Sequence, residues 1–179
     1  MTGRAFVVTG GPGSGKSTLI AALADEGFAT MPEGGRAIIR DQQAIGGDAL
    51  PWRDRAAFAQ AMMLWDMRSW HAAQAMAGPV ICDRGLPDVI GYRTLCGLPV
   101  PDALRRAAAV FRYERTVFIA PHWPAIFHRD AERRQDEAEA QATHDAMAAT
   151  YAALGYELVA LPRAPVAERV AFVRARIAG

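Results

Sequence analysis

Lysine is almost absent from this chain of 179 residues: Lys16 is the only one, and apart from the four histidines every other basic residue is an arginine. Arginine and lysine are not interchangeable: the guanidinium is a rigid planar fork, whereas the ammonium is a compact point charge on a flexible stem. Position 16 is therefore a candidate for a role that requires an ammonium.

The chain also lacks a strong net charge, metal-type cysteines and long apolar runs. Its formal net charge is +1, so no global field attracts nucleic acid or an anionic membrane. The two cysteines, Cys82 and Cys96, have no CxxC spacing, which favours inert thiols over a disulfide or a metal site. No apolar run of about 18 residues predicts a membrane span, and the N-terminus does not resemble a signal peptide. We expect a cytoplasmic protein that binds neither nucleic acid nor membrane.

What is present is a regular alternation of short apolar runs and helical patterns. The length fits one domain over residues 1–179, and strands that alternate with helices predict a parallel sheet covered on both faces. Five runs predict strands, at 5–10, 28–33, 79–83, 115–120 and 156–161. Helical spacing predicts helices at 15–27, 35–43, 52–78, 86–97, 101–112 and 164–179.

The glycine-rich stretch between the first strand and the first helix matches GxxxxGK[ST], with Gly10, Gly15, Lys16 and Ser17 at the defining positions. Its glycines allow backbone N–H groups to converge on one point, to which the helix N-terminus adds positive partial charge. We predict that this loop binds ATP, that Lys16 reaches the terminal phosphates and that Ser17 ligates Mg²⁺. The alternative is a turn that only caps the helix. The predicted contacts are Gly11, Pro12, Gly13, Ser14, Gly15, Lys16, Ser17 and Thr18.

An acid and an arginine follow the predicted strand at 79–83. Ligands gather at the carboxyl ends of strands in such sheets, so Asp83 is expected beside the loop, where it would hold Mg²⁺ directly or through water. The alternative is that Asp83 caps the helix beginning near Leu86. Arg84 suits an anionic substrate group or the migrating phosphoryl group, or else an ion pair with Asp88.

Glu33 lies just past the second predicted strand and is a candidate base for the proton of an acceptor hydroxyl. The alternative is a carboxylate that the dipole of the following helix favours. Arg36, one turn further, suits an anionic part of the substrate. The aromatic residues at 52, 58, 65 and 70 either line a pocket for a flat ring or pack in the core.

A charged segment separates the fourth and fifth predicted strands. Arg129 and Arg133 share a helical face at i, i+4. In a lid over about residues 127–142 they would close over the phosphates and exclude water. A solvated helix with internal salt bridges accounts for the same residues.

Two absences narrow the chemistry. Guanine-specific GTPases read the base with an NKxD or TKxD element, which is excluded because the single lysine is Lys16. ATP-hydrolysing machines usually place Glu directly after the metal-binding acid, where this chain has Arg84. We predict an ATP-dependent phosphotransferase acting on a small-molecule acceptor; the alternative is a regulatory nucleotide-binding ATPase with slow hydrolysis.

Five stretches, GGPGSGKSTL, PEGGR, CDRGLPDVIGY, RDAERRQ and LGYELVALP, resemble small P-loop kinase-like proteins with an AAA-type ATPase domain, related to ribosylnicotinamide kinase and to deoxynucleoside and nucleotide kinases. The resemblance covers nearly the whole chain. It implies a three-layer α/β/α sandwich with strand order 2-3-1-4-5, ATP with Mg²⁺, and a carboxylate at Glu33 or Asp83 near the acceptor. In deoxynucleoside kinases a Glu after the second strand acts as base beside an Arg, and Glu33 and Arg84 fall on those positions.

Overall fold

The computed structural model describes residues 3–126 and 137–178. Within these ranges the strands form one sheet in which every pairing is parallel, in the order β2-β3-β1-β4-β5. This is the predicted strand order. The strands are β1 (Arg4–Gly10), β2 (Ala29–Met31), β3 (Pro79–Asp83), β4 (Thr116–Ala120) and β5 (Glu157–Ala160).

Helices connect the strands, and most lie where the helical spacing predicts them. The predicted helix at 52–78 is shorter, because the Asp54 side chain accepts the N–H of Ala57 at 2.9 Å and caps its start. A helix also occupies residues for which the sequence showed only a charged segment. The helices are α1 (Lys16–Asp25), α2 (Gly34–Ile45), α3 (Arg55–Gln74), α4 (Leu86–Leu95), α5 (Asp102–Val110), α6 (Glu137–Ala153) and α7 (Val166–Ile177), with a 3₁₀ turn at Pro124–Ile126.

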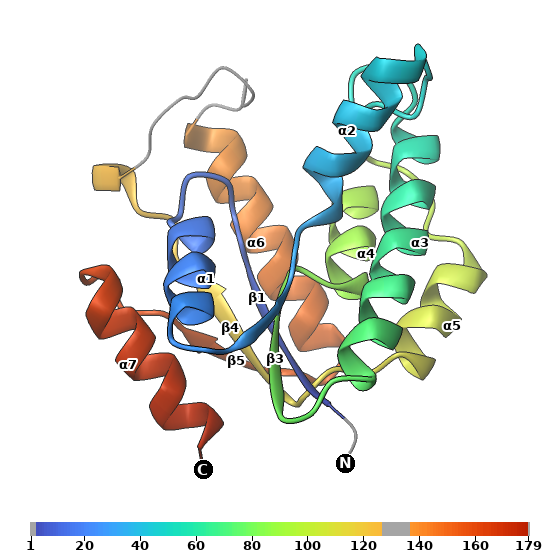
Figure 1. The fold of residues 1–179 in the computed structure, drawn as a ribbon. Coiled ribbons are helices and arrows are strands. Elements are labelled where there is room, and N and C mark those ends of the chain that lie inside the picture. The colour runs from blue at the N-terminus through green and yellow to red at the C-terminus, as the bar shows by residue number, and fades with distance from the viewer. Residues whose placement is uncertain (1–2, 127–136, 179) are drawn as a thin grey trace.

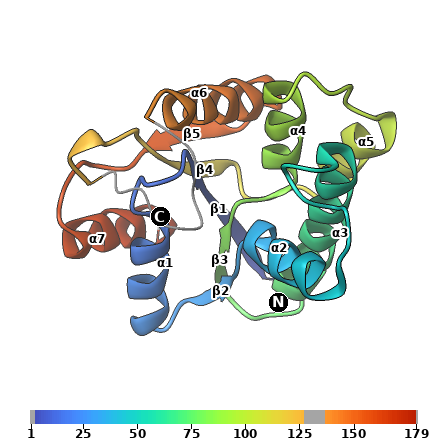
Figure 2. The same cartoon turned by 90° about the horizontal axis from the view of Figure 1, so that it is seen from above.

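The sheet lies between two helical layers (Figures 1 and 2). Helices α1 and α7 cover one face, and α3, α4 and α6 cover the other. Alternate residues of β1 supply the two cores: Phe6 and Val8 pack toward α1 and α7, whereas Ala5 and Val7 pack toward the other layer. This is the alternation that a buried strand requires, and it confirms the α/β/α arrangement.

The carboxyl edge of the sheet positions the site. Strands β2 and β3 lie on one side of β1 in the sheet, and β4 and β5 lie on the other side. The direction in which successive strands are added to the sheet therefore reverses at β1. Crevices at such reversals are where open α/β sheets bind ligands. In Figure 1 the turn after β1 and helix α2 both stand at this edge. Among the described residues, no helix has both the length and the apolar character that crossing a membrane requires.

Candidate active site

The turn between β1 and α1 has a backbone that depends on glycine. Gly10, Gly13 and Gly15 have φ angles of 134°, 67° and 77°, a region that side chains with a Cβ disfavour. A Cβ on Gly10 would lie 2.6 Å from the carbonyl oxygen of Ala120, and one on Gly11 would collide with the backbone of α6. The glycines therefore serve both the shape of the turn and its close contact with neighbouring backbone.

The ammonium of Lys16 lies over this turn. Its Nζ donates to the carbonyl oxygen of Gly11 at 2.7 Å and to Oγ of Ser14 at 3.4 Å. The Ser14 hydroxyl also donates to the Gly11 carbonyl, at 2.8 Å. Lys16 is only 5% exposed, so the loop carries a positive charge that bulk water screens weakly.

A cavity of about 500 Å³ opens beside the loop, within the usual size range of small-molecule sites. Residues 13–18 form one wall, and Arg36 and Arg169 also line it. Gly11 and Pro12, earlier in the same loop, are buried and do not line the cavity. The remaining wall is mostly apolar and comes from the turn after β4 and the loop before α7: Trp123, Ile126, Ala164, Pro165 and Val166.

Asp83 ends β3, beside β1 in the sheet, where it is in register with Val8. Its Oδ1 is buried and has no hydrogen-bond partner among the described residues. Burial raises the pKa of Asp83, and the charge of Glu33 raises it further, against the opposing effects of Lys16 and Arg84. A carboxylate oxygen without a partner fits a Mg²⁺ ligand. Ser17, the other predicted ligand, is exposed on the cavity wall.

The alternative role of Asp83 as a helix cap does not match the structure. The N-cap of α4 is Gly85, and its N–H donates to Oδ2 of Asp88 at 3.1 Å. No group of three or more His, Cys, Asp or Glu side chains suited to a metal occurs within residues 3–126 and 137–178. A metal held by Asp83 and Ser17 would therefore need a ligand such as the phosphates to complete its coordination.

The Arg84 side chain links Glu33, in the turn after β2, to Asp88 on α4. Its Nε donates to Oε1 of Glu33 at 3.2 Å, and its Nη1 donates to Oδ1 of Asp88 at 3.1 Å. Its backbone has a φ of 70°, and its N–H donates to the carbonyl of Val8 at 3.0 Å. Burial lowers the pKa of Arg84, but the three surrounding carboxylates outweigh that effect and raise it. The expected pairing with Asp88 is present, and it lies in the interior rather than on the surface.

Asp88 is the centre of this network and is only 5% exposed. Besides Arg84 and the N–H of Gly85, it accepts hydrogen bonds from the hydroxyls of Thr9 and Tyr151, each at 2.5 Å. It thereby joins β1, α4 and α6 at the carboxyl edge. Sequence reasoning had given Asp88 only the pairing with Arg84.

Asp66, on α3, was missed by sequence reasoning altogether. It is 8% exposed, and its side chain makes no hydrogen bond to another described residue. Burial raises its pKa well above the ordinary value; Asp88, Glu33 and Asp83 raise it further, and Arg84 opposes them. We call Glu33, Asp66, Asp83 and Asp88, with Arg84 among them, the acidic cluster.

Glu33 lies at the N-cap of α2, but its side chain makes no capping hydrogen bond. The carboxylate instead binds Arg84. Glu33 therefore lies beside Arg84, as the resemblance to deoxynucleoside kinases implies. The role of Glu33 as base stays a prediction. The predicted lid residues Arg129 and Arg133 lie outside the described residues, as does segment 127–136; residues 137–142 belong to α6.

The four aromatic residues that the sequence left open between the core and a ring-binding pocket have different surroundings. Phe58 is buried, and Trp70 packs edge-on against Phe111, so both belong to the core. The indole N–H of Trp65 donates to the carbonyl of Pro32 at 3.3 Å, whereas Trp52 is an exposed residue. The thiol of Cys82 is buried, which raises its pKa to about 12 and makes it unreactive, as expected.

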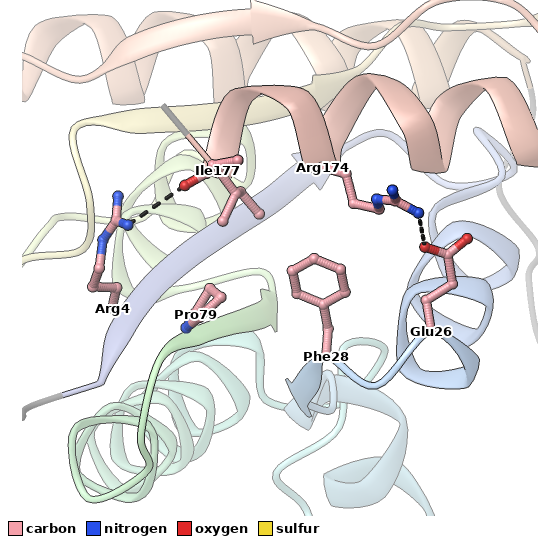
Figure 3. A pocket seen from close by; sticks show the side chains of 7 residues that line it. Arg4, Glu26, Phe28, Pro79, Arg174 and Ile177 are labelled. Carbon is pink, nitrogen blue, oxygen red and sulfur yellow. Dashed lines mark hydrogen bonds and ion pairs between the residues drawn. The ribbon is translucent and has the colours of Figure 1, made fainter.

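A second cavity, of about 460 Å³, lies at the start of strands β1 and β3, the opposite edge of the sheet (Figure 3). Arg4 donates to the carbonyl of Ile177 at 3.4 Å, and Arg174 pairs with Glu26 at 2.8 Å. Both arginines thus have partners within the chain, and the cavity lies away from the loop.

A glycine-rich loop around Lys16, at the edge of a parallel sheet ordered 2-3-1-4-5, defines a P-loop protein with the fold of nucleoside and nucleotide kinases. The chain belongs to the AAA domain family, whose model matches residues 5–169. A sequence search of curated proteins finds no match.

Solved structures show the same fold at low identity. A structure of NadR in complex with NR is 18% identical with a TM-score of 0.76, over 99% of this chain and 52% of that one, so the chain spans about half of NadR. Deoxyadenosine kinase from M. mycoides is 14% identical with a TM-score of 0.69, over 98% of this chain and 99% of that one. Thymidylate kinase from Ehrlichia chaffeensis is 13% identical with a TM-score of 0.67, over the full length of both.

Proposed function

We propose that the protein transfers the γ-phosphoryl group of ATP to a hydroxyl group of a small molecule, nucleoside-like or nucleotide-like. One observation carries the proposal: the loop around Lys16 and the unpartnered carboxylate oxygen of Asp83 stand at the same edge of the sheet. These are the phosphate-binding and metal-binding elements that phosphoryl transfer requires. Support comes from related folds, since NadR has been solved with AMP-PNP and deoxyadenosine kinase with dATP.

The loop would bind the phosphates. Backbone N–H groups of residues 13–18 and the Lys16 ammonium hold the β- and γ-phosphates, as in other P-loop sites. Ser17 and Asp83 would hold Mg²⁺, which neutralises charge on the transferred group when bound. The apolar wall around Trp123 suits the nucleobase.

The acceptor would lie beyond Asp83, next to Glu33. Its hydroxyl oxygen forms a bond to the γ-phosphorus, the bond from that phosphorus to the β–γ bridging oxygen breaks, and ADP leaves with the electron pair. The acceptor proton passes to the Glu33 carboxylate, which Arg84 orients at 3.2 Å. Arg129 and Arg133 are proposed to close over the phosphates and exclude water.

The test measures ATP binding and transfer separately. Purified protein with Mg-ATP is offered nucleosides, nicotinamide riboside, sugars and small alcohols, and ADP and phosphorylated products are quantified. Lys16→Ala is expected to weaken ATP binding, measured by calorimetry, about 100-fold or more, because it removes the ammonium that neutralises the negative charge of the phosphates. Glu33→Gln should keep ATP affinity within about twofold and slow transfer about 10²- to 10⁴-fold.

The matched control is Glu26→Gln, the same change at the opposite edge of the sheet, where Glu26 pairs with Arg174. It should leave both binding and transfer unchanged. Equal ATP affinity in wild type and Lys16→Ala would overturn the proposal. Phosphate release at the same rate with and without every acceptor would replace transfer by slow hydrolysis in a regulatory nucleotide-binding module.

A further inference from the structure

An arginine from the last helix reaches the carbonyl side of the glycine-rich loop. Arg169, in the first turn of α7, donates from Nη1 to the carbonyl oxygen of Gly15 and from Nη2 to that of Ser14, each at 3.3 Å. More than 150 residues of sequence separate these partners. Nothing in the proposed chemistry assigns a task to Arg169, although it also lines the cavity.

The surroundings of Arg169 are unusual for a guanidinium. The residue is 3% exposed, and its Nε is buried without a hydrogen-bond partner. No ion pair involves it within the described parts of the chain, and burial lowers its pKa. Burying a charge without an opposite charge is costly, and the two loop carbonyls compensate only in part. A buried cation of this kind adds positive potential to the loop beside it.

The two carbonyls also determine where the loop's N–H groups point. A trans peptide unit is planar, with its C=O and N–H directed to opposite sides, and none of the described peptide bonds is cis. Holding the Ser14 carbonyl from behind therefore directs the N–H of Gly15 away from Arg169, and holding the Gly15 carbonyl does the same for the N–H of Lys16. A cation on the carbonyl oxygen also polarises the peptide, which makes its N–H a stronger donor.

The glycine at position 15 accommodates this contact. A Cβ there would lie 2.6 Å from Nη1 of Arg169, and the φ of Gly15 is 77°. The glycine before Lys16 thus leaves room for the guanidinium as well as for the turn. The Gly15 carbonyl also accepts the N–H of Leu19 at 3.1 Å, the first hydrogen bond of α1, so Arg169 acts where loop and helix join.

We propose that Arg169 is a positioning residue for the nucleotide: it fixes the two peptide units of Ser14–Gly15 and Gly15–Lys16 with their N–H groups toward the phosphates and adds a positive charge behind the loop. This inference rests on the proposed function, because it assumes that the loop binds a polyphosphate. It predicts that Arg169 contributes to affinity for the phosphate tail and not for the nucleoside.

The experiment compares Arg169→Ala and Arg169→Lys with Arg174→Ala by calorimetry, using Mg-ATP, inorganic tripolyphosphate and adenosine. Arg174 is the control because it lies on the same helix and its side chain is 59% exposed. Arg169→Ala should weaken tripolyphosphate and Mg-ATP binding about 10- to 100-fold, the range for one hydrogen bond that involves a charged group. Arg169→Lys should recover part of that loss, and Arg174→Ala should change neither by more than about twofold.

Two further measurements distinguish the proposed positioning role of Arg169 from a purely structural one. In ¹⁵N-labelled protein, tripolyphosphate should shift the amide resonances of Gly15 and Lys16 in wild type and Arg174→Ala, and much less in Arg169→Lys, which keeps the charge and the packing stem. Low millimolar guanidinium should partly restore tripolyphosphate affinity to Arg169→Ala. If Arg169→Ala does not fold, the lysine variant and these amide shifts decide the matter.

The outcomes separate the two claims. If wild type binds Mg-ATP and the folded Arg169 variants bind tripolyphosphate within twofold of it, the inference fails and the proposed function stands. If wild type binds neither Mg-ATP nor tripolyphosphate, the proposed function fails and takes the inference with it. If the variants lose adenosine and tripolyphosphate affinity equally, Arg169 has only a structural role and the inference is overturned.

Discussion

The carboxyl edge of the sheet has a nucleotide half, around the glycine-rich loop, and an acceptor half, around the acidic cluster. The two halves differ in whether backbone or side-chain groups form them. The nucleotide half is mainly backbone: a glycine turn held by one lysine and, from behind, by Arg169, and open to a cavity of about 500 Å³. The acceptor half is made of side chains, with acids from four segments around Arg84 and hydrogen bonds that converge on Asp88. A backbone site suits the phosphate tail that every nucleoside triphosphate shares, whereas a side-chain site can be adapted to one acceptor.

The difference also lies in how each half is stabilised. Removing the Lys16 side chain from the nucleotide half leaves the course of the turn in place, because its glycines and α1 define it. Removing a side chain from the acidic cluster leaves buried charges or donors without partners, which is costly. We therefore expect changes in the nucleotide half to affect binding first, and changes in the acceptor half to affect the stability of the fold first.

The largest effect on stability is expected from Asp88→Ala. The change leaves the hydroxyls of Thr9 and Tyr151 and part of Arg84 without their acceptor. Breaking a buried ion pair typically costs about 3–5 kcal/mol, so urea unfolding should show a loss of that order. Asp48→Ala is the control, because Asp48 pairs with Arg53 on the surface and its loss should cost under about 1 kcal/mol. Similar unfolding midpoints for both variants would erase the contrast between the two halves.

A smaller loss is expected from Tyr151→Phe, which keeps the ring and removes only the hydroxyl bound to Asp88. Hydrogen bonds to charged groups contribute about 1.5–3 kcal/mol, against about 1 for neutral ones. Tyr156→Phe is the matched control, because the one hydrogen bond of its hydroxyl within residues 3–126 and 137–178 is the one it accepts from the backbone N–H of Tyr113, at 3.3 Å. Urea unfolding should therefore rank Tyr151→Phe as the more destabilised variant. The reverse ranking would mean that Asp88 is not the centre of the network.

The smallest effect at pH 5 is expected from Asp66→Asn, and this effect grows with pH. Because burial raises the folded-state pKa of Asp66 above its ordinary value of 3.8, its contribution to stability is fully present below that value and is lost as pH rises through the raised pKa. Asn stays neutral, so the variant should gain stability relative to wild type as pH rises, by about 1.4 kcal/mol for each unit of pKa shift. Urea unfolding at pH 5 and pH 8 measures the gain, and a constant difference between the proteins would refute it.

The nucleotide half could be predicted from the sequence because its determinants are local. Gly10 to Ser17 form one continuous stretch, and their spacing alone defines the turn. The strand order 2-3-1-4-5 came from the resemblance, since pairing between distant strands leaves no local pattern. The end of β3 was also predictable, because an acid after a short apolar run marks the carboxyl edge.

The rest depended on contacts between segments far apart in the chain. Asp66 falls on the buried face of α3 with Ala59, Met63 and Ala73, and an acid at such spacing was a signal that could have identified it. Arg169 shares a stripe of α7 with Val173 and Ile177, which marks it as buried without revealing what it binds. Of the four donors that converge on Asp88, the sequence indicated only Arg84; the hydroxyls of Thr9 and Tyr151 come from distant segments, so no local pattern marks them.

The contact between Trp65 and Gly34 joins two helices of the acceptor half. A Cβ on Gly34 would lie 2.5 Å from the indole ring, so the backbone at the start of α2 is in close contact with that ring. A residue larger than glycine at position 34 would therefore have to displace either the indole ring or the start of α2. The residue at this contact is a tryptophan beside the helix whose N-cap is Glu33, so once the other three tryptophans of the chain are replaced, its fluorescence can report on this junction without any attached dye.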